Sequence, residues 1–158
     1  MKEKPISYSS TVMSQVMLPS QANPAGNVHG GEIMKIMDTA AGVVARKHCR
    51  TNVVTARVDE LEFHLPILVG ELLTCKGHLV YVGRSSMEVA VMVEVENLLT
   101  ELPARKALSA YFTMVALDKN GIPTPVPSLK LETAEEEAAF EEGRLRHEFY
   151  KKKKQCKQ

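Results

Sequence analysis

The spacing of hydrophobic and polar residues changes several times along this chain, and each change predicts a different element. Residues 7–18 alternate loosely and are rich in Ser, Thr and Val, which favours a strand. After a polar segment with Asn, Pro and Gly, apolar positions recur at helical spacing from residue 30 to residue 48. Because these positions fill most of the circumference, the pattern predicts a long helix that is buried on most sides. The positions are Ile33, Ile36, Met37, Ala40, Val43 and Val44.

Downstream of this helix the spacing shortens to that of strands. Four segments carry β-branched residues with partial alternation and are separated by short turn signals, so we expect sequence neighbours to pair antiparallel. The segments are 53–64, 71–83, 85–97 and 105–118. A long central helix wrapped by an antiparallel sheet of about five strands is the simplest α+β arrangement, since each element buries the apolar face of the other.

The chain divides into one domain and a C-terminal extension. Residues 1–120 form the predicted domain, and the prolines of residues 121–132 are typical of an extended surface linker. Thr133 followed by Glu136 matches a capping box, which predicts a helix and a basic tail over residues 133–158. Acidic residues in the first turn and lysines near the end suit the dipole of this helix.

Composition narrows the classes of function. The 158 residues are 44% hydrophobic, and 20 Lys and Arg balance 19 Asp and Glu, so we expect no nucleic-acid and no membrane partner. No stretch resembles a signal peptide or a membrane span, and the three cysteines form no CxxC pair, which predicts a cytoplasmic protein with free thiols. No two of the five histidines have the i, i+4 spacing of a helical metal site, so no metal is expected.

One acidic residue interrupts the apolar helix. Asp38 lies among hydrophobic and small residues, and a carboxylate on a buried helix costs several kcal/mol unless it is paired, hydrogen-bonded or protonated. Asp38 therefore has either a structural role, such as an ion pair with Arg57 or His29, or a chemical one. Its position alone does not separate the two roles.

Residues just before the helix favour the chemical role. Gly30 and Gly31 lie at the predicted helix start, where unpaired N–H groups and the helix dipole can hold a carbonyl oxygen. Asn23, in the preceding loop, has an amide that both donates and accepts hydrogen bonds. Each feature also has a structural explanation, an N-cap for the glycines and a turn for Asn23 before its proline. The order of amide, glycine-bounded helix start and internal acid is more specific than any one of them.

Four sequence blocks, in this order, resemble the hotdog-fold acyl-CoA thioesterases, especially bacterial acyl-CoA hydrolases and their cytosolic long-chain relatives. The blocks are NPAGNVHGGEIMKIMD (23–38), FHLPILVGE (63–71), VGRSSMEV (82–89) and AYFTMVALD (110–118). The first block is highly specific, and the others support it. The resemblance implies a long helix wrapped by an antiparallel sheet. It also implies hydrolysis of acyl-CoA to a free fatty acid and coenzyme A, without a cofactor.

The resemblance assigns roles to the residues around the helix start. Asp38 would be the catalytic carboxylate, as general base or as nucleophile, and Asn23 would position water and thioester. The N–H of Gly31 would donate to the thioester oxygen. Because sites in this family form between two protomers, Asn23 and Asp38 of one site can belong to different chains. Gly30 and His29 are further candidates, with His29 either a second base or a structural histidine.

Contacts to the coenzyme A part of the substrate are expected elsewhere. Gly83, Arg84, Ser85 and Ser86 form a short turn that offers an Arg and two hydroxyls to phosphate oxygens. Read alone, this segment is a hairpin turn with an exposed Arg, and the resemblance assigns it to coenzyme A. Arg57 could add another phosphate contact.

Two other functions would use the same residues. A hydratase or dehydratase acting on acyl thioesters would use His29 and Asp38 to transfer protons. A non-catalytic acyl-CoA sensor would bind its ligand without turnover. Release of a free thiol distinguishes hydrolysis from both. Relatives assemble as dimers and as trimers of dimers, so the resemblance implies a homo-oligomer and, as the expected form, a homohexamer.

Overall fold

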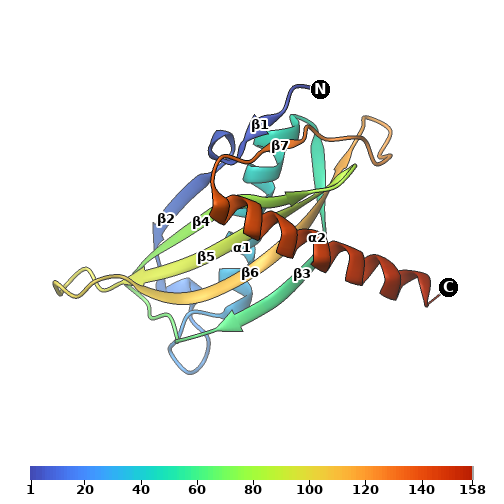
Figure 1. The fold of residues 1–158 in the computed structure, drawn as a ribbon. Helices are drawn as coiled ribbons and strands as arrows, with labels where there is room; N and C mark the ends of the chain where they lie inside the picture. The colour runs from blue at the N-terminus through green and yellow to red at the C-terminus, as the bar shows by residue number, and fades with distance from the viewer. Residues whose placement is uncertain (158) are drawn as a thin grey trace.

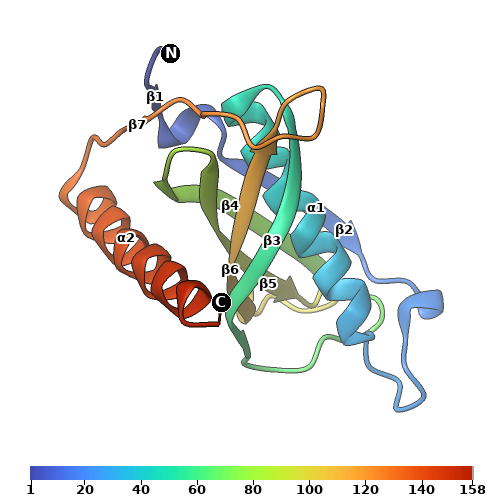
Figure 2. The ribbon, with the colours of Figure 1, turned by 90° about the vertical axis from the view of Figure 1, so that its right-hand side faces the viewer.

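A computed structural model describes residues 1–157 as a sheet wrapped around one long helix, with a second helix on the outside of the sheet (Figure 1 and Figure 2). Gln158, the last residue of the predicted tail, lies outside the described residues. The elements are β1 (Lys4–Pro5), β2 (Thr11–Val16), α1 (Gly30–Cys49), β3 (Asn52–Phe63), β4 (Leu72–Val82), β5 (Ser86–Glu96), β6 (Arg105–Leu117), β7 (Leu129–Lys130) and α2 (Ala134–Gln155).

The central helix α1 confirms the prediction from apolar spacing, and it ends one residue beyond the predicted range. His29 is its N-cap, and Arg50 ends it in the left-handed conformation, with φ of 59°. The face toward the sheet consists largely of small and apolar residues, which allow strands to approach closely. Those without any exposed surface are Met37, Ala40, Ala41, Val44 and Ala45.

The sheet has the strand order β2-β4-β5-β6-β3, with antiparallel pairing throughout. The expected pairing of sequence neighbours is confirmed for β4 with β5 and for β5 with β6. It is wrong for β3 and β4, because β3 pairs with β6 at the far edge, where Val58 lies opposite Phe112. Residues 64–71 carry the chain to β4, and they are too long a segment for a tight hairpin. Within residues 1–157, β3 is an edge strand of this sheet and pairs only with β6.

The first predicted strand and the predicted linker both differ in the structure from what the sequence pattern indicated. Only Thr11–Val16 of the predicted first strand is a strand, because Ile6–Tyr8 forms a 3-10 helix. The linker is extended, as predicted, but it is not a free surface segment. Its β7 pairs in parallel with β1, and its Val126 and Leu129 are buried in the core.

Helix α2 lies on the face of the sheet opposite α1 (Figure 2). The predicted capping box is only half formed. Thr133 is the N-cap, and its Oγ1 accepts from Glu136 N at 3.1 Å, but the Glu136 carboxylate accepts from the N–H of Glu132 and not from that of Thr133. Gly143 lets the helix approach β4 so closely that an added Cβ would lie 2.6 Å from Cβ of Tyr81. Within the described residues, no helix is long and apolar enough to cross a membrane.

Candidate active site

Asp38 lies on the face of α1 that the chain's own sheet leaves open, and it is exposed. The expectation of a buried acid is therefore wrong for the single chain. Lys35 and Thr39, on the same side of α1, are exposed as well, so the chain's own sheet does not cover this side of the helix. Asp38 does not form either of the ion pairs considered for it. Instead its Oδ1 accepts a hydrogen bond of 2.5 Å from the hydroxyl of Thr55 on β3.

Thr55 is the site residue that the sequence reasoning missed. It lies outside the four resembling blocks, and as a polar residue in a strand it gave no signal of its own. The fold brings it to Asp38 because β3 pairs with β6, where Thr55 is aligned with Met114. Its hydroxyl lies 2.5 Å from Asp38 and 3.5 Å from the sulfur of Met114, so it faces α1.

The start of α1 is capped from within the chain. Nδ1 of His29 accepts the N–H of Gly31 at 3.1 Å, so the N-cap is His29, and the two glycines are the first residues of the helix. For Gly31 to donate to a substrate oxygen instead, the imidazole of His29 must turn away. Gly30 lies under the ring of Phe63, whose edge would be 3.9 Å from an added Cβ. The helix start is thus close to the end of β3.

Asn23 shapes the loop before α1. Its Oδ1 accepts the backbone N–H groups of Ala25 at 3.0 Å and Asn27 at 3.2 Å, so its predicted turn role is confirmed. These bonds use the amide oxygen and leave the NH2 group as the donor that a ligand could meet. The loop is held by a bond of 2.8 Å from Val28 N to Ile67 O.

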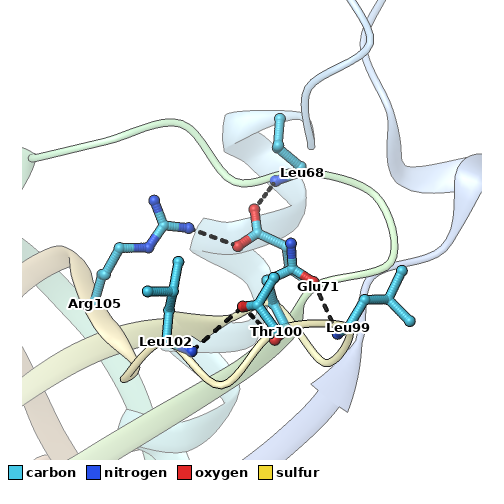
Figure 3. A network of polar contacts seen from close by, with 7 residues as sticks. Leu68, Glu71, Leu99, Thr100, Leu102 and Arg105 are labelled. Carbon is cyan, nitrogen blue, oxygen red and sulfur yellow. Dashed lines mark hydrogen bonds and ion pairs between the residues drawn. The ribbon is translucent and has the colours of Figure 1, made fainter.

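A polar network around Glu71 holds the segment that pairs with this loop (Figure 3). Glu71 is only 5% exposed, and its carboxylate accepts Leu68 N at 2.9 Å and pairs with Arg105 at 2.9 Å. Leu68 in turn forms a backbone bridge with Asn27, which is bonded to Asn23. The ion pair between Glu71 and Arg105, at the start of β6, therefore fixes the segment next to the Asn23 loop.

The predicted coenzyme A segment is the tight hairpin between β4 and β5, as its structural explanation requires. Gly83 N donates to Ser86 O at 2.8 Å, and Arg84 is exposed while its carbonyl accepts from Val126 N at 2.9 Å. Ser86 pairs with Val115 of β6, and the neighbouring Met114 pairs with Thr55 of β3. The hairpin thus lies two strand spacings from Thr55, roughly 10 Å. Its contact with coenzyme A stays a prediction.

Arg57 is not brought to Asp38. It lies on the outer face of the sheet under α2, where its Nε pairs with Asp59 at 2.7 Å. Its guanidinium also stacks over the ring of Tyr150, 3.7 Å from the centroid. Because both contacts are on the far side of β3 from Thr55, the phosphate contact expected of Arg57 stays a prediction.

The separation along α1 decides whether one chain can complete a site. Asp38 comes seven positions after Gly31, which corresponds to about 10 Å along the helix axis. That is farther than the few ångströms between the oxygen of a thioester and the group that attacks its carbonyl carbon. A single chain therefore does not bring the helix start and Asp38 to the same bond. Among other nucleophiles, burial raises the pKa of the Cys75 thiol to about 12, which keeps it protonated.

Comparisons with known proteins agree with this arrangement. The model of the Thioesterase superfamily matches residues 25–101. A rat protein named as a cytosolic acyl coenzyme A thioester hydrolase is 42% identical over 151 residues, which cover 95% of this chain and 40% of that protein. The chain thus spans about two fifths of the length of this relative.

Solved structures are similar over nearly the whole chain. A hexameric acyl-CoA thioesterase without ligand has a TM-score of 0.90 and 35% identity, with 97% of each chain covered. An acyl-CoA hydrolase from Staphylococcus aureus, in complex with butyryl coenzyme A and coenzyme A, has a TM-score of 0.87 and 31% identity, covering 96% of this chain and 92% of that one. Both likenesses include the sheet and both long helices.

Variants of the S. aureus protein add one correspondence. An Asn, an Asp and a Thr of that protein were each replaced by Ala in solved structures. Going along its sequence, these residues are separated by 15 and then 17 positions. Asn23, Asp38 and Thr55 have the same order and the same separations here.

Proposed function

The chain belongs to the hotdog-fold acyl-CoA thioesterases of the thioesterase superfamily, and we propose that it hydrolyses acyl-CoA to a free fatty acid and coenzyme A. The observation that carries the proposal is the hydrogen bond from Thr55 to Asp38 on the open face of α1. It holds one carboxylate oxygen and leaves the other available for chemistry. The reaction consumes only water besides the thioester, so no step is given to a metal or a cofactor.

In the proposed reaction Asp38 acts as a general base. Its carboxylate takes a proton from water while the water oxygen attacks the thioester carbonyl carbon, and the C–S bond then breaks to release coenzyme A as a thiol. General-base assistance of this kind is worth about 10² to 10⁴-fold in rate. Direct attack by Asp38, through a mixed anhydride that water opens afterwards, is the other route to the same products.

We assign the remaining groups to positioning. The Thr55 hydroxyl fixes the orientation of the Asp38 carboxylate, and the NH2 group of Asn23 and the N–H of Gly31 donate toward the thioester. Since about 10 Å of helix separate Gly31 from Asp38, these donors come from a second protomer. Arg84 and its hairpin neighbours would hold the phosphates of coenzyme A. A homo-oligomer, with a hexamer as in the structural neighbour, supplies such a shared site.

The first test is thiol release from acyl-CoAs of short to long chain. We expect the wild-type protein to release thiol, and we expect Asp38→Ala to lower kcat by about 10² to 10⁴-fold without loss of fold. Thr55→Val should lower kcat less, because it removes only the bond that orients the carboxylate. An absence of thiol release at every chain length, with binding of acyl-CoA retained, would instead identify a sensor or a hydratase.

A subunit-mixing experiment tests the shared site directly. Neither Asn23→Ala nor Asp38→Ala protein should be active alone, but co-expressed chains form dimers in which one of the two sites has both residues. Random pairing then restores about a quarter of the wild-type activity, given the twofold symmetry of such dimers. No restoration in confirmed mixed dimers would place both residues in one chain's site. Co-expression of Asp38→Ala with Asp38→Asn is the matched control and should restore nothing.

The location in the cell is also part of the proposal. The rat relative is named as cytosolic, and we propose that this chain acts in the cytoplasm. Detection of the tagged full chain in a fractionated cell tests this.

A further inference from the structure

The outward side of α2 carries a row of exposed side chains. Phe140 and Gly143 are on the side facing the sheet, where both lie against Tyr81. The residues on the opposite side follow one another at spacings of three and four, so they share one face of the helix. All of them are exposed, and Figure 2 shows one side of α2 open to solvent, away from the sheet. The row, called the α2 stripe below, consists of Ala138, Glu141, Glu142, Leu145, Phe149, Lys152, Lys153 and Cys156.

The chemistry of the α2 stripe changes from acidic to apolar to basic along the helix. Two glutamates come first and two lysines come last. Between them Leu145 is 53% exposed and Phe149 is 60% exposed, one helical turn apart. A helix with this order is complementary to itself when one copy is turned end for end, because the basic half then faces the acidic half and the apolar centres meet.

We propose that the α2 stripe binds the α2 stripe of a second copy of this chain, with the two helices antiparallel about a twofold axis. The axis passes midway between Leu145 and Phe149, so that Leu145 of each copy packs against Phe149 of the other. This contact removes the two most exposed large apolar side chains of the helix from water. It is distinct from the shared site proposed above, and it does not depend on the hydrolysis reaction.

The same register pairs opposite charges. Glu142 of each copy faces Lys152 of the other, and Glu141 faces Lys153, so the interface contains each pair twice. Glu141 already forms an exposed ion pair with Arg144 on its own helix, at 2.5 Å. Because exposed pairs of this kind are worth little, Glu141 can exchange that partner for a lysine at small cost.

The surface beside the α2 stripe suits the same occupant. A groove of about 430 Å³ runs between α2 and β3, and its walls include Glu60, Glu142, Leu145 and Phe149. Leu145 and Phe149 give the groove an apolar part on the helix side, where Arg146 also lines it, and Glu60 and Glu142 add exposed carboxylates. The aromatic ring of Phe149 and the lysines of a second copy match both properties.

An anionic lipid surface is the rival occupant, because Lys151–Lys154 form a basic run next to Phe149. The α2 stripe argues against it. Glu141 and Glu142 lie on the same face as the lysines, and a negatively charged membrane would repel them. Only a partner that is itself acidic at one end and basic at the other satisfies the whole stripe.

Charge reversal tests the interface in the full-length protein by sedimentation velocity over a range of concentrations. Glu141→Lys with Glu142→Lys makes the stripe basic throughout, and Lys152→Glu with Lys153→Glu makes it acidic throughout. We expect each protein alone to lose α2-mediated association by about tenfold or more. An equimolar mixture of the two should associate again, and so should one chain carrying all four changes.

The matched control reverses two lysines off the stripe. Lys151→Glu with Lys154→Glu makes the same change in net charge at the same end of the helix, and it should leave association as in the wild type. If the control and the stripe variants behave alike, or if the mixture fails to associate, the proposal is wrong. Sedimentation with vesicles of phosphatidylserine and phosphatidylcholine completes the test, because binding that is lost on Lys152→Glu with Lys153→Glu would favour the lipid surface.

Thiol cross-linking tests the antiparallel register. Cys156 lies at the basic end of the stripe and is exposed, and the register brings it to Ala138 of the second copy. In the Ala138→Cys protein we expect mild oxidation to join the introduced thiol to Cys156 of another chain. Ala139→Cys, which faces the sheet, is the control and should cross-link much less. Cross-links mainly between two copies of Cys156 would indicate a parallel arrangement and overturn the proposal.

Discussion

The two helices of this protein are similar in length, 20 residues in α1 and 22 in α2, but different forces hold them. α1 buries eight residues, mostly small or aliphatic, against the inside of the sheet. α2 buries one, Gly143, and is held by aromatic contacts with Tyr81 and by an ion pair between Arg146 and Glu88. The inner helix therefore sets the stability of the domain, while the outer helix keeps most of its surface for other contacts.

The acids associated with the two helices differ in the same way. Glu88, under α2, is 3% exposed and bonded to Arg146 at 2.6 Å, and burial raises its pKa although the arginine opposes this. Asp38, on α1, is exposed and has a hydroxyl as its partner. A fully paired acid is suited to holding an element in place. An acid with one free oxygen on an open face is suited to chemistry.

The largest expected effect is a core truncation in α1. Met37→Ala should lower the free energy of unfolding by about 2–5 kcal/mol, because Met37 has no exposed surface and its removal leaves a cavity. Phe140→Ala on α2 removes a larger side chain that is only half-buried, and it should cost about 1–2 kcal/mol. Urea unfolding at a fixed protein concentration measures both. Equal losses would contradict the division of roles between the helices.

One glycine inside each helix, Gly143 in α2 and Gly42 in α1, should respond to replacement in opposite directions. Gly143→Ala places a methyl group 2.6 Å from Cβ of Tyr81, so α2 must shift, at about 1–3 kcal/mol. Gly42→Ala on α1 meets only the tip of the Arg46 side chain, and it should be neutral or stabilise by up to about 1 kcal/mol. Hydrogen exchange resolved by helix is the measurement. Faster exchange confined to α2 in the Gly143 variant is the expected pattern, and unchanged exchange in α2 would show that the contact is not close.

The sequence predicted the elements well where one period was sustained. The helix over 30–48 and the strands over 71–83, 85–97 and 105–118 match α1, β4, β5 and β6 to within two residues. It failed where pairing is decided by tertiary structure. Nothing local to residues 53–64 indicates that β3 crosses to β6, so Thr55 could not be assigned to Asp38. The buried surroundings predicted for Asp38 were wrong for the same reason, since apolar content says how much of α1 is covered but not which side.

Glu71 and Glu88 are both buried and each is paired with an arginine, so replacing one or the other gives a matched comparison. The expected effect, on kcat, is smaller than those above. Glu71→Gln keeps an acceptor for Leu68 N but loses the ion pair with Arg105, so the segment behind Asn23 loosens. We expect kcat for thioester hydrolysis to fall about tenfold, which corresponds to about 1.4 kcal/mol. Glu88→Gln loosens α2 instead and should affect kcat less. Steady-state kinetics distinguish the two, and equal effects on kcat would contradict the link from Glu71 to the Asn23 loop.

The smallest effect is expected in the pH dependence of stability. His48, near the end of α1, has no exposed surface, and burial lowers its pKa. The charge of Lys4 lowers this pKa further, while the hydrogen bond to Pro127 O raises it. His147 on α2 is only half-buried, and burial, Lys151 and Arg57 lower its pKa too. For both residues the unfolded chain binds a proton more readily than the folded one. The stability that comes from keeping these two histidines neutral is therefore fully present above about pH 6.5, and it is lost as the pH falls through the pKa of the folded state.

Replacing each histidine in turn compares how much the two helices contribute to the pH dependence of stability. His48→Gln retains a donor for Pro127 O, and it should flatten the fall in unfolding free energy between about pH 8 and pH 5.5. His147→Gln should flatten it less, because a half-buried imidazole on α2 loses less solvation on folding. Urea unfolding at the two pH values gives both slopes. If His147→Gln had the larger effect, α2 would be packed as tightly as α1, and the polar attachment of the outer helix would have to be abandoned.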